Sequence, residues 1–364
     1  MSLTSMISPF IVSRLGTKLS LIIGAITYLI YVLADLLPVV CYNRSITTGI
    51  CTSRVIYTEA YIANIITGIG GSLLWVAQGA AIKERAEGNA TYLQGIFWIF
   101  YMGNNVIGNI LSAILNMNKN LQMILYGTLA GFGILAIIVM LFIGKPMKEN
   151  VQISCCDTGK SVRDAWALIF SIKLFPFLSL MFYKGALLTF FSGSFPRLAI
   201  HTMHTDDRFY ENRHTSYLFF CQGVASAISG MAYGVLTRKI MPRSKGMITS
   251  VINIFTFVLV FVLYVLDHFD FSWYIAATLL GISDGTINTF MIGFLASEFT
   301  TPSVQFGAFV LFKGMAQFVM YLISSFTIES VPYGLTFAHI CMSILGLTTF
   351  MMYKFSKQNK DNIK

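Results

Sequence analysis

Three ionisable residues lie deep inside apolar stretches of the chain, namely Lys184, Asp284 and Lys313. A charged group inside hydrocarbon is costly, so such a residue is by default a candidate for function. Asn288 follows Asp284 by four residues and Gln317 follows Lys313 by four, and residues four apart share a helix face. The functional interpretation is a polar cavity lining in which Asp284 accepts a proton or pairs with a cation.

Each of these residues also has a structural interpretation. Asp284 and Lys313 could form an ion pair that holds two helices together, since buried pairs serve as packing devices as well as sites. Lys184 could extend its aliphatic stem so that the ammonium group reaches the lipid headgroups. The sequence leaves these alternatives open.

A second set of polar residues lies nearer to the N-terminus. Asn105, Asn109 and Ser112 have the spacing of one helix face, and Gln78 follows Trp75 by three residues on the preceding apolar stretch. The functional interpretation is a strip that faces a substrate. The alternative is close helix packing through small and amide residues.

The patterns of soluble enzymes are absent from the sequence. There is no phosphate-binding loop, no dinucleotide fingerprint and no zinc-ligand spacing. His201, His204 and His214 fall in one predicted loop, where solvated histidines are more common than a metal site. We therefore expect no enzyme activity, no cofactor and no metal.

The elements that must position these residues are membrane-spanning helices. Of the 364 residues, 55% are hydrophobic and 11% are charged, whereas soluble domains carry about 25% charged residues. A helix crosses a bilayer with about 20 apolar residues, and backbone groups in hydrocarbon must be paired internally. Ten such helices are predicted, at 19–40, 60–82, 93–117, 121–144, 172–194, 215–237, 247–266, 271–297, 305–328 and 333–353.

The basic residues predict how these helices are threaded. The net charge is +9, but the lysines and arginines form short clusters between apolar stretches, which excludes a nucleic-acid-binding surface. With the loop at Arg14 and Lys18 in the cytoplasm, 17 basic residues fall on the cytoplasmic side and 6 on the opposite side. This bias is the one that membrane proteins show. The C-terminus is therefore expected to be cytoplasmic, in either the plasma membrane or an internal membrane.

A polar segment divides the chain. Residues 145–171 form a predicted cytoplasmic loop between an N-terminal bundle, 1–144, and a six-helix C-terminal bundle, 172–353. Such a division is typical of transporters built from two bundles. The basic tail, 354–364, is expected to contact anionic headgroups of the lipid bilayer.

One predicted outer loop carries two candidate modifications. Asn43 begins the glycosylation sequence Asn-Arg-Ser, whereas the similar sequence at Asn89 falls on the cytoplasmic side, where no glycan is expected. Cys41 and Cys51 either close a disulfide in this loop or remain two free thiols. Cys155 and Cys156 are candidates for palmitoylation beside the membrane.

Several strings now suggest a family. They are SRLGTK (13–18), GIGGSLLWVAQG (68–79), GIFWIFYMGNNVIGN (95–109), FYKGALLTFFSGSFP (182–196), GISDGTINTFMIGFLASEF (281–299) and QFGAFVLFKGMAQFVMY (305–321). In this order and spacing they resemble the Unc-ninety-three-like (ion channel regulatory protein) branch of the major facilitator superfamily. The resemblance covers almost the whole chain.

The resemblance implies a major-facilitator-type two-bundle fold of twelve helices. Here about 10 full transmembrane helices and an N-terminal partial helix can be read, so the first helix and part of the second are expected to be missing. The resemblance also implies a gating loop. Arg14, Gly16 and Lys18 match its pattern, but Ser13 stands where the superfamily has an aspartate, which suggests weakened gating.

Two functions follow from these observations. The first is a secondary transporter that moves an unknown small solute or ion around a site at the middle of the membrane. The second is a non-transporting accessory protein that binds a membrane-protein partner, because the resemblance implies that some members regulate ion channels or escort receptors.

Overall fold

The computed structural model describes residues 2–5, 7–85, 90–115, 119–142, 175–237, 240, 242–298, 302–327 and 332–351. These residues form helices and short turns, and no strand occurs among them. Each of the ten predicted stretches coincides with a helix, which confirms the all-α membrane fold. Eight of the described helices are long and apolar enough to cross a bilayer. The predicted loop 145–171, with Cys155 and Cys156, and the tail 354–364 lie outside the described residues.

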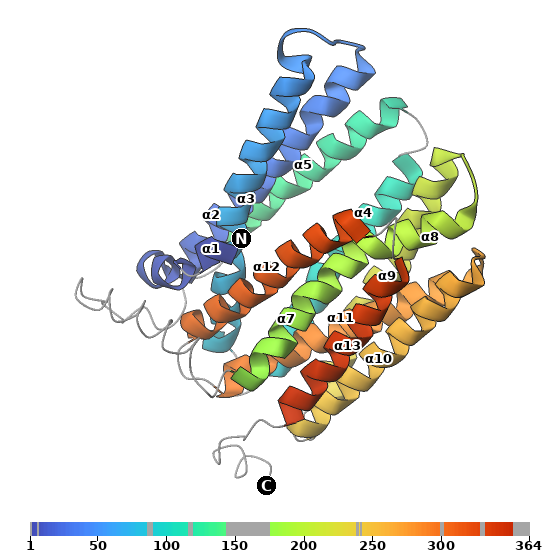
Figure 1. Ribbon diagram of the computed structural model, residues 1–364. Helices are drawn as coiled ribbons and strands as arrows, with labels where there is room; N and C mark the ends of the chain where they lie inside the picture. The colour runs from blue at the N-terminus through green and yellow to red at the C-terminus, as the bar shows by residue number, and fades with distance from the viewer. Residues whose placement is uncertain are drawn as a thin grey trace. The chain divides into compact units, whose positions relative to one another are not determined.

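The chain divides into two compact units, of which unit 1 comprises residues 1–85, 111–166 and 301–311. Its main element is the pair of long helices α2 (Ser8–Asn43) and α3 (Ser53–Arg85), which lie side by side (Figure 1). Helix α5 (Lys119–Leu141) packs on α2, and the short α1 (Ser2–Ser5) packs on α3. Only 11% of the apolar segment of α5 is buried, so most of this helix presents a surface suited to lipid.

Helix α2 is interrupted at Gly16, within the predicted gating loop. Gly16 has φ 79° and ψ 159°, a backbone conformation that is essentially restricted to glycine. Nearby, the Nζ atom of Lys18 donates a hydrogen bond to the carbonyl oxygen of Leu141, at 2.8 Å. This bond satisfies one of the carbonyls left open at the end of α5. The guanidinium carbon of Arg14 lies 5.1 Å from the centre of the Phe10 ring.

Unit 2 comprises residues 86–110, 167–300 and 312–364. Its described residues include the first part of α4 (Ala90–Leu115) and the second part of α12 (Pro302–Thr327). They also form six further helices: α7 (Phe175–Thr189), α8 (Phe195–Met203), α9 (Arg208–Leu236), α10 (Pro242–Leu266), α11 (Phe271–Glu298) and α13 (Pro332–Met351). Helix α11 is the central element, because 83% of its apolar segment is buried and it packs on α7, α9 and α10.

The predicted helix 172–194 continues further than the sequence indicated. Residues Phe190–Ser194 form one π-helical turn, and α8 follows it directly to Met203. The apolar pattern does not distinguish a π-helical turn from an α-helical one, so this feature was not predicted. Such turns are rare and occur frequently at functional sites.

Helix starts in unit 2 follow from local sequence. Asp207 caps α9 by accepting a hydrogen bond from the backbone N–H of Phe209 at 2.9 Å, and Asp270 accepts one from the N–H of Ser272 at 2.9 Å. Carboxylates at a helix N-terminus satisfy donors that have no partner within the helix. These caps fix where α9 and α11, two of the helices that carry the candidate site, begin.

Candidate functional site

The candidate site is a buried ion pair in unit 2. The Nζ atom of Lys184, on α7, donates a hydrogen bond to Oδ1 of Asp284, on α11. Lys184 is 1% exposed and Asp284 is 4% exposed. Lys184 is thus a direct partner of Asp284. The interpretation that Lys184 extends to the lipid headgroups is wrong, because its ammonium group is bound inside the unit.

The Asp284 carboxylate accepts further hydrogen bonds from neighbouring side chains. Asn288 Nδ2 donates to its Oδ1 at 3.2 Å, and Ser226 Oγ, on α9, donates to its Oδ2 at 3.0 Å. Trp98 Nε1, on α4, in turn donates to Ser226 Oγ at 2.9 Å. Since bonds to a charged group inside a protein are strong, this network ties α4, α7, α9 and α11 to one carboxylate.

Two glycines allow the helices to approach closely enough for these contacts. A Cβ atom on Gly285 would lie 2.3 Å from Ser229 Oγ and 2.4 Å from the carbonyl oxygen of Ser226. A Cβ on Gly185 would lie 2.1 Å from the carbonyl oxygen of Lys313. Side chains at these two positions would force α11 from α9, and α7 from α12.

Lys313 belongs to the same cluster through its charge. Lys313 interacts electrostatically with both Lys184 and Asp284. Lys313 is partly exposed, whereas Lys184 and Asp284 are buried. Gln317, one turn further along α12, accepts a hydrogen bond from Thr189 Oγ1 through its backbone oxygen at 3.4 Å. The structure thus brings Lys184, Asp284, Asn288 and Lys313 together.

Three residues near this cluster were not predicted. Ser226 and Trp98 are part of the network, and Gln222 is 1% exposed with no hydrogen-bond partner for either of its side-chain polar atoms. Gln222 precedes Ser226 by four residues, so the two share a face of α9. A polar pair at helical spacing inside the apolar stretch 215–237 was the signal available in the sequence.

Two ionisable residues inside predicted helices were also missed. Asp35, on α2 in unit 1, is hydrogen-bonded to Tyr31 one turn earlier. His339, on α13, is fully buried and its Nε2 lies 3.1 Å from the carbonyl oxygen of Ala186, with the rings of Phe190 and Phe257 beside it. The rule that singled out Asp284 applies equally to Asp35.

The polar residues of the first half of the chain are divided between the two units. Asn109 Nδ2 donates to the carbonyl oxygen of Asn105 within α4, at 2.7 Å. Asn105 itself packs against Gly223 of α9, on the helix that carries Ser226. Gln78 is buried in α3 of unit 1. Asn105 therefore lies beside α9, a helix of the Asp284 network.

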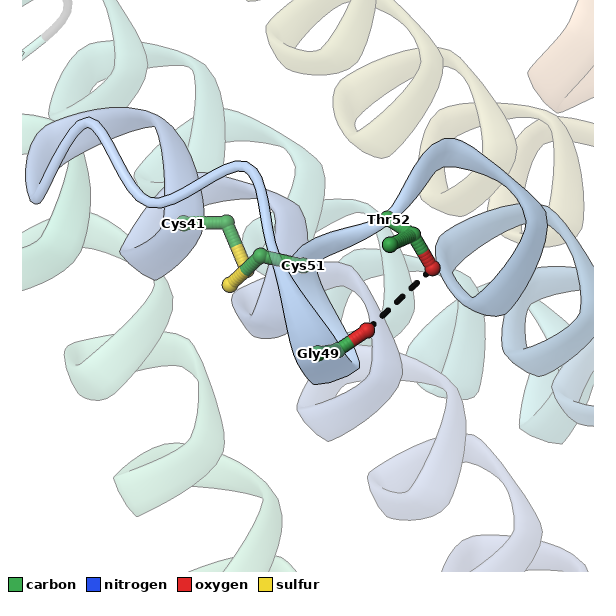
Figure 2. Close-up of a disulfide and its surroundings, with 4 residues drawn as sticks. All are labelled: Cys41, Gly49, Cys51 and Thr52. Atoms are coloured by element: carbon green, nitrogen blue, oxygen red, sulfur yellow. Dashed lines mark hydrogen bonds between the residues drawn. A yellow bond between two sulfur atoms is a disulfide. The ribbon is translucent and has the colours of Figure 1, made fainter.

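A disulfide joins the last turn of α2 to the segment that follows it. Figure 2 shows the bond between Cys41 and Cys51, whose Cα atoms are 5.5 Å apart. Thr52 Oγ1 donates to the carbonyl oxygen of Gly49 at 3.2 Å in the same segment. Of the two alternatives for these cysteines, the structure has the disulfide. Asn43 lies two residues after Cys41 and is partly exposed.

The loop histidines do not gather into a metal site. His201 Nδ1 and His204 Nε2 lie 3.7 Å and 3.4 Å from Oδ1 of Asp267, and all three side chains are more than half exposed. His214 Nδ1 instead faces the hydroxyl of Tyr274. Among the described residues, no group of three or more histidine, cysteine, aspartate or glutamate side chains has a geometry that could hold a metal ion.

Unit 1 has a separate hollow between α2 and α3. Its volume is about 580 Å³, and its lining is mostly apolar, with Ile30, Leu33 and Ile62 among the lining residues and Arg54 and Glu59 as its charged members. None of the residues singled out from the sequence lines it, so the ion pair of unit 2 remains the stronger candidate.

Comparison with known sequences gives two results. Residues 1–351 match the family described as "Ion channel regulatory protein UNC-93". An UNC93-like protein of Schizosaccharomyces pombe is 34% identical over 143 residues, which is 38% of this chain and 26% of the yeast protein. The chain thus aligns with about a quarter of the length of that relative.

Comparison with solved structures identifies the fold. The Escherichia coli fucose:proton symporter FucP, a major facilitator superfamily transporter, superposes with a TM-score of 0.68 at 11% identity over 97% of this chain and 88% of FucP. A bacterial homologue of the iron transporter ferroportin, in an outward-facing state, superposes with a TM-score of 0.59 at 14% identity over 96% of this chain and 88% of that one. The chain is a multi-pass membrane protein with a major-facilitator-type fold, and it belongs to the UNC-93 family.

Proposed function

We propose that this protein is a secondary transporter of a small solute, with the Lys184–Asp284 pair at its binding and coupling site. The observation that carries the proposal is the burial of both charges in the middle of two apolar helices. A buried ion pair rarely repays its desolvation cost in stability, and an ionisable group at membrane depth usually marks a solute or proton pathway. The pair is therefore better explained by function than by packing.

The π-helical turn supports a moving helix next to this pair. It begins at Phe190, six residues after Lys184 on the same continuous helix. Ser192 and Ser194 of this turn bond to Tyr321 at 2.6 Å and to Ser324 at 3.0 Å, both on α12. Transporters of this kind alternate access by bending or rocking helices around a fixed site. Bending at the π-helical turn would change the access to Lys184.

The orientation and the bundle division are part of the proposal. The positive-inside bias supports a cytoplasmic C-terminus, with the Cys41–Cys51 loop and a glycan on Asn43 on the other side. The bundles are 1–144 and 172–353, joined by 145–171, and Arg14, Gly16 and Lys18 form the gating loop of the first bundle. The membrane is either the plasma membrane or an internal one.

Uptake into proteoliposomes tests the transport function. The purified chain is reconstituted, and the uptake of labelled sugars, amino acids, organic acids and organic cations is measured with and without an inward proton gradient. Asp284→Asn is expected to lower the uptake of the transported solute at least about tenfold, as expected for a lost charge interaction. Asp206→Asn, which changes an exposed acid in the loop before α9, is the matched control and is expected to behave like the wild type. Uptake that is unchanged in Asp284→Asn would contradict the proposal.

The alternative is an accessory protein that regulates a channel or escorts a receptor. It is favoured by the family's description as an ion channel regulatory protein. In this case the bilayer-embedded chain has a stable membrane-protein partner. Affinity purification from native membranes tests this alternative. If a partner is recovered in equimolar amount and no solute uptake is measured, the regulatory function is correct and the transport function is wrong.

A further inference from the structure

The middle of unit 2 contains more positive than negative charge. Among the described helices of this unit, the lysine and acidic side chains away from the helix ends are Lys184, Asp284 and Lys313. With all three ionised, the cluster carries one excess positive charge. Like charges repel strongly where the dielectric constant is low, and a buried charge is stabilised by an opposite one.

The carboxylate of Asp284 already has hydrogen-bond donors around it. It accepts hydrogen bonds from Lys184, Asn288 and Ser226, which use both of its oxygens. A cationic solute would have to displace these donors and would meet two ammonium groups. An anionic solute would be attracted by the two ammonium groups and would leave the hydrogen bonds to Asp284 in place.

Lys313 is the place where a solute could enter the cluster. Its residue is partly exposed, whereas Lys184 and Asp284 are buried. The close approach of Gly185 to the Lys313 backbone holds α12 against α7 next to Lys184. An anion at Lys313 would therefore be near the excess charge and would still be accessible from outside the cluster.

Gln222 is an independent indication of a ligand. Its side chain is almost fully buried, yet neither its amide nitrogen nor its amide oxygen has a hydrogen-bond partner. It lies on the same face of α9 as Ser226, one turn away, and Ser226 is bonded to Asp284. Buried amides are nearly always hydrogen-bonded, so this one is available to donate to a carboxylate.

We propose that Lys313, Lys184 and Gln222 bind the carboxylate group of a small monovalent organic anion. This inference rests on the proposed transport function and names its substrate class. Lys313 provides the charge that attracts the anion, Gln222 donates a hydrogen bond from its amide, and Lys184 remains paired with Asp284 while contributing to the positive potential. A single negative charge neutralises the cluster, which is why a monovalent anion fits better than a divalent one.

Binding is tested on the full chain in detergent. The thermal unfolding temperature is measured with L-lactate, pyruvate, inorganic phosphate, choline and glucose, and uptake of the same compounds is then measured in proteoliposomes. Lactate or pyruvate is expected to raise the unfolding temperature and to be taken up. Lys313→Gln is expected to weaken the apparent affinity by roughly 30-fold or more, the effect of losing one partner of a buried charge interaction. Lys245→Gln, which changes a partly buried lysine near the start of α10, is the matched control.

A second variant separates binding from folding. Gln222→Leu removes the unpaired amide and is expected to raise the unfolding temperature without solute while reducing the shift caused by lactate or pyruvate. A purely structural residue would not change these two quantities in opposite directions. An unchanged solute response in both Gln222→Leu and Lys313→Gln would overturn the inference.

The outcomes distinguish this inference from the proposed function. Uptake of choline or glucose, with no response to the carboxylates, overturns the anion site and leaves transport standing. Preference for phosphate over both carboxylates overturns the substrate class in the same way. Binding of lactate or pyruvate without uptake keeps the anion site and overturns transport. If none of the compounds binds or moves, both proposals fail.

Discussion

Trp98 and Asp284 lie on different helices of unit 2 and are joined by a single hydroxyl group, that of Ser226. The hydroxyl accepts a hydrogen bond from Trp98 Nε1 at 2.9 Å and donates one to Asp284 Oδ2 at 3.0 Å. All three residues are buried. The indole of α4 therefore helps to orient the carboxylate that pairs with Lys184, although it does not contact this carboxylate in any of the bonds described.

This relationship predicts non-additive effects of substitution. Trp98→Phe removes one donor and is expected to destabilise the protein by about 1 kcal/mol, whereas Ser226→Ala leaves both Trp98 and Asp284 without their shared partner and is expected to cost about 2–3 kcal/mol. Because Ser226→Ala already breaks the bond to Trp98, the double variant should lose less than the sum. The unfolding temperature in detergent measures these losses. Strictly additive losses would mean that the two bonds are independent.

The ion pair predicts a second stability pattern. Asp284→Asn leaves the Lys184 ammonium buried without a counter-charge and is expected to cost about 3–5 kcal/mol. The double variant Lys184→Met with Asp284→Leu removes both charges and is expected to be more stable than Asp284→Asn, because no uncompensated charge remains. Thermal unfolding of the single and double variants decides this. A double variant that is less stable than either single variant would show that the pair itself stabilises the fold.

The helices could be predicted from the sequence, whereas the pairing of their charges could not. Ten apolar stretches were long enough to span a bilayer. Inside hydrocarbon, the backbone N–H and C=O groups of such a stretch must bond to each other, which a helix allows. The partner of Asp284 depends on how α7, α11 and α12 are rotated about their axes. A single sequence does not contain this information, so it indicates Lys313 as a partner and does not reveal Lys184, which the structure pairs with Asp284.

Local constraints were predicted better than distant ones. Cys41 and Cys51 fall in one short loop, so their proximity followed from the chain itself, and the structure joins them. Ser226 and Trp98 are 128 residues apart, so their contact depends on how α4 and α9 pack. The π-helical turn at Phe190–Ser194 depends on packing against α12, which the apolar pattern does not reveal.

The disulfide predicts a dependence on reductant. Cys41→Ser and Cys51→Ser are each expected to lower the stability by about 2–4 kcal/mol, the usual value for a native disulfide, and the double variant should equal either single one. Dithiothreitol should destabilise the wild type alone. Alkylation followed by mass spectrometry provides the second measurement, with Cys221, which has no disulfide partner, as the matched control. Labelling of Cys41 without reductant would show that the bond is absent.

The glycosylation site predicts a shift in mass. In a eukaryotic host, the wild type is expected to lose one glycan when it is treated with an endoglycosidase, and Asn43→Gln and Ser45→Ala should both abolish this shift, because each breaks the acceptor sequence. Asn89→Gln is the control, since the positive-inside bias places Asn89, which is outside the described residues, in the cytoplasm. A glycan on Asn89 would reverse the proposed orientation of the whole chain.

The backbone conformation of Gly16 predicts a residue-specific effect in the proposed gating loop. Its φ of 79° with ψ of 159° is accessible essentially to glycine alone, so Gly16→Ala is expected to cost about 1–3 kcal/mol. Gly16→Asn should not rescue the loss, because asparagine tolerates the left-handed helical region and not this one. Gly131→Ala on α5 is the matched control, because a Cβ there meets no atom within 4 Å and alanine favours the helix. The Lys18 bond to Leu141 closes the loop against α5, so the Gly16 variants should also expose a trypsin site at Lys18. Equal unfolding temperatures for Gly16→Ala and Gly131→Ala would show that the chain does not need the break at Gly16.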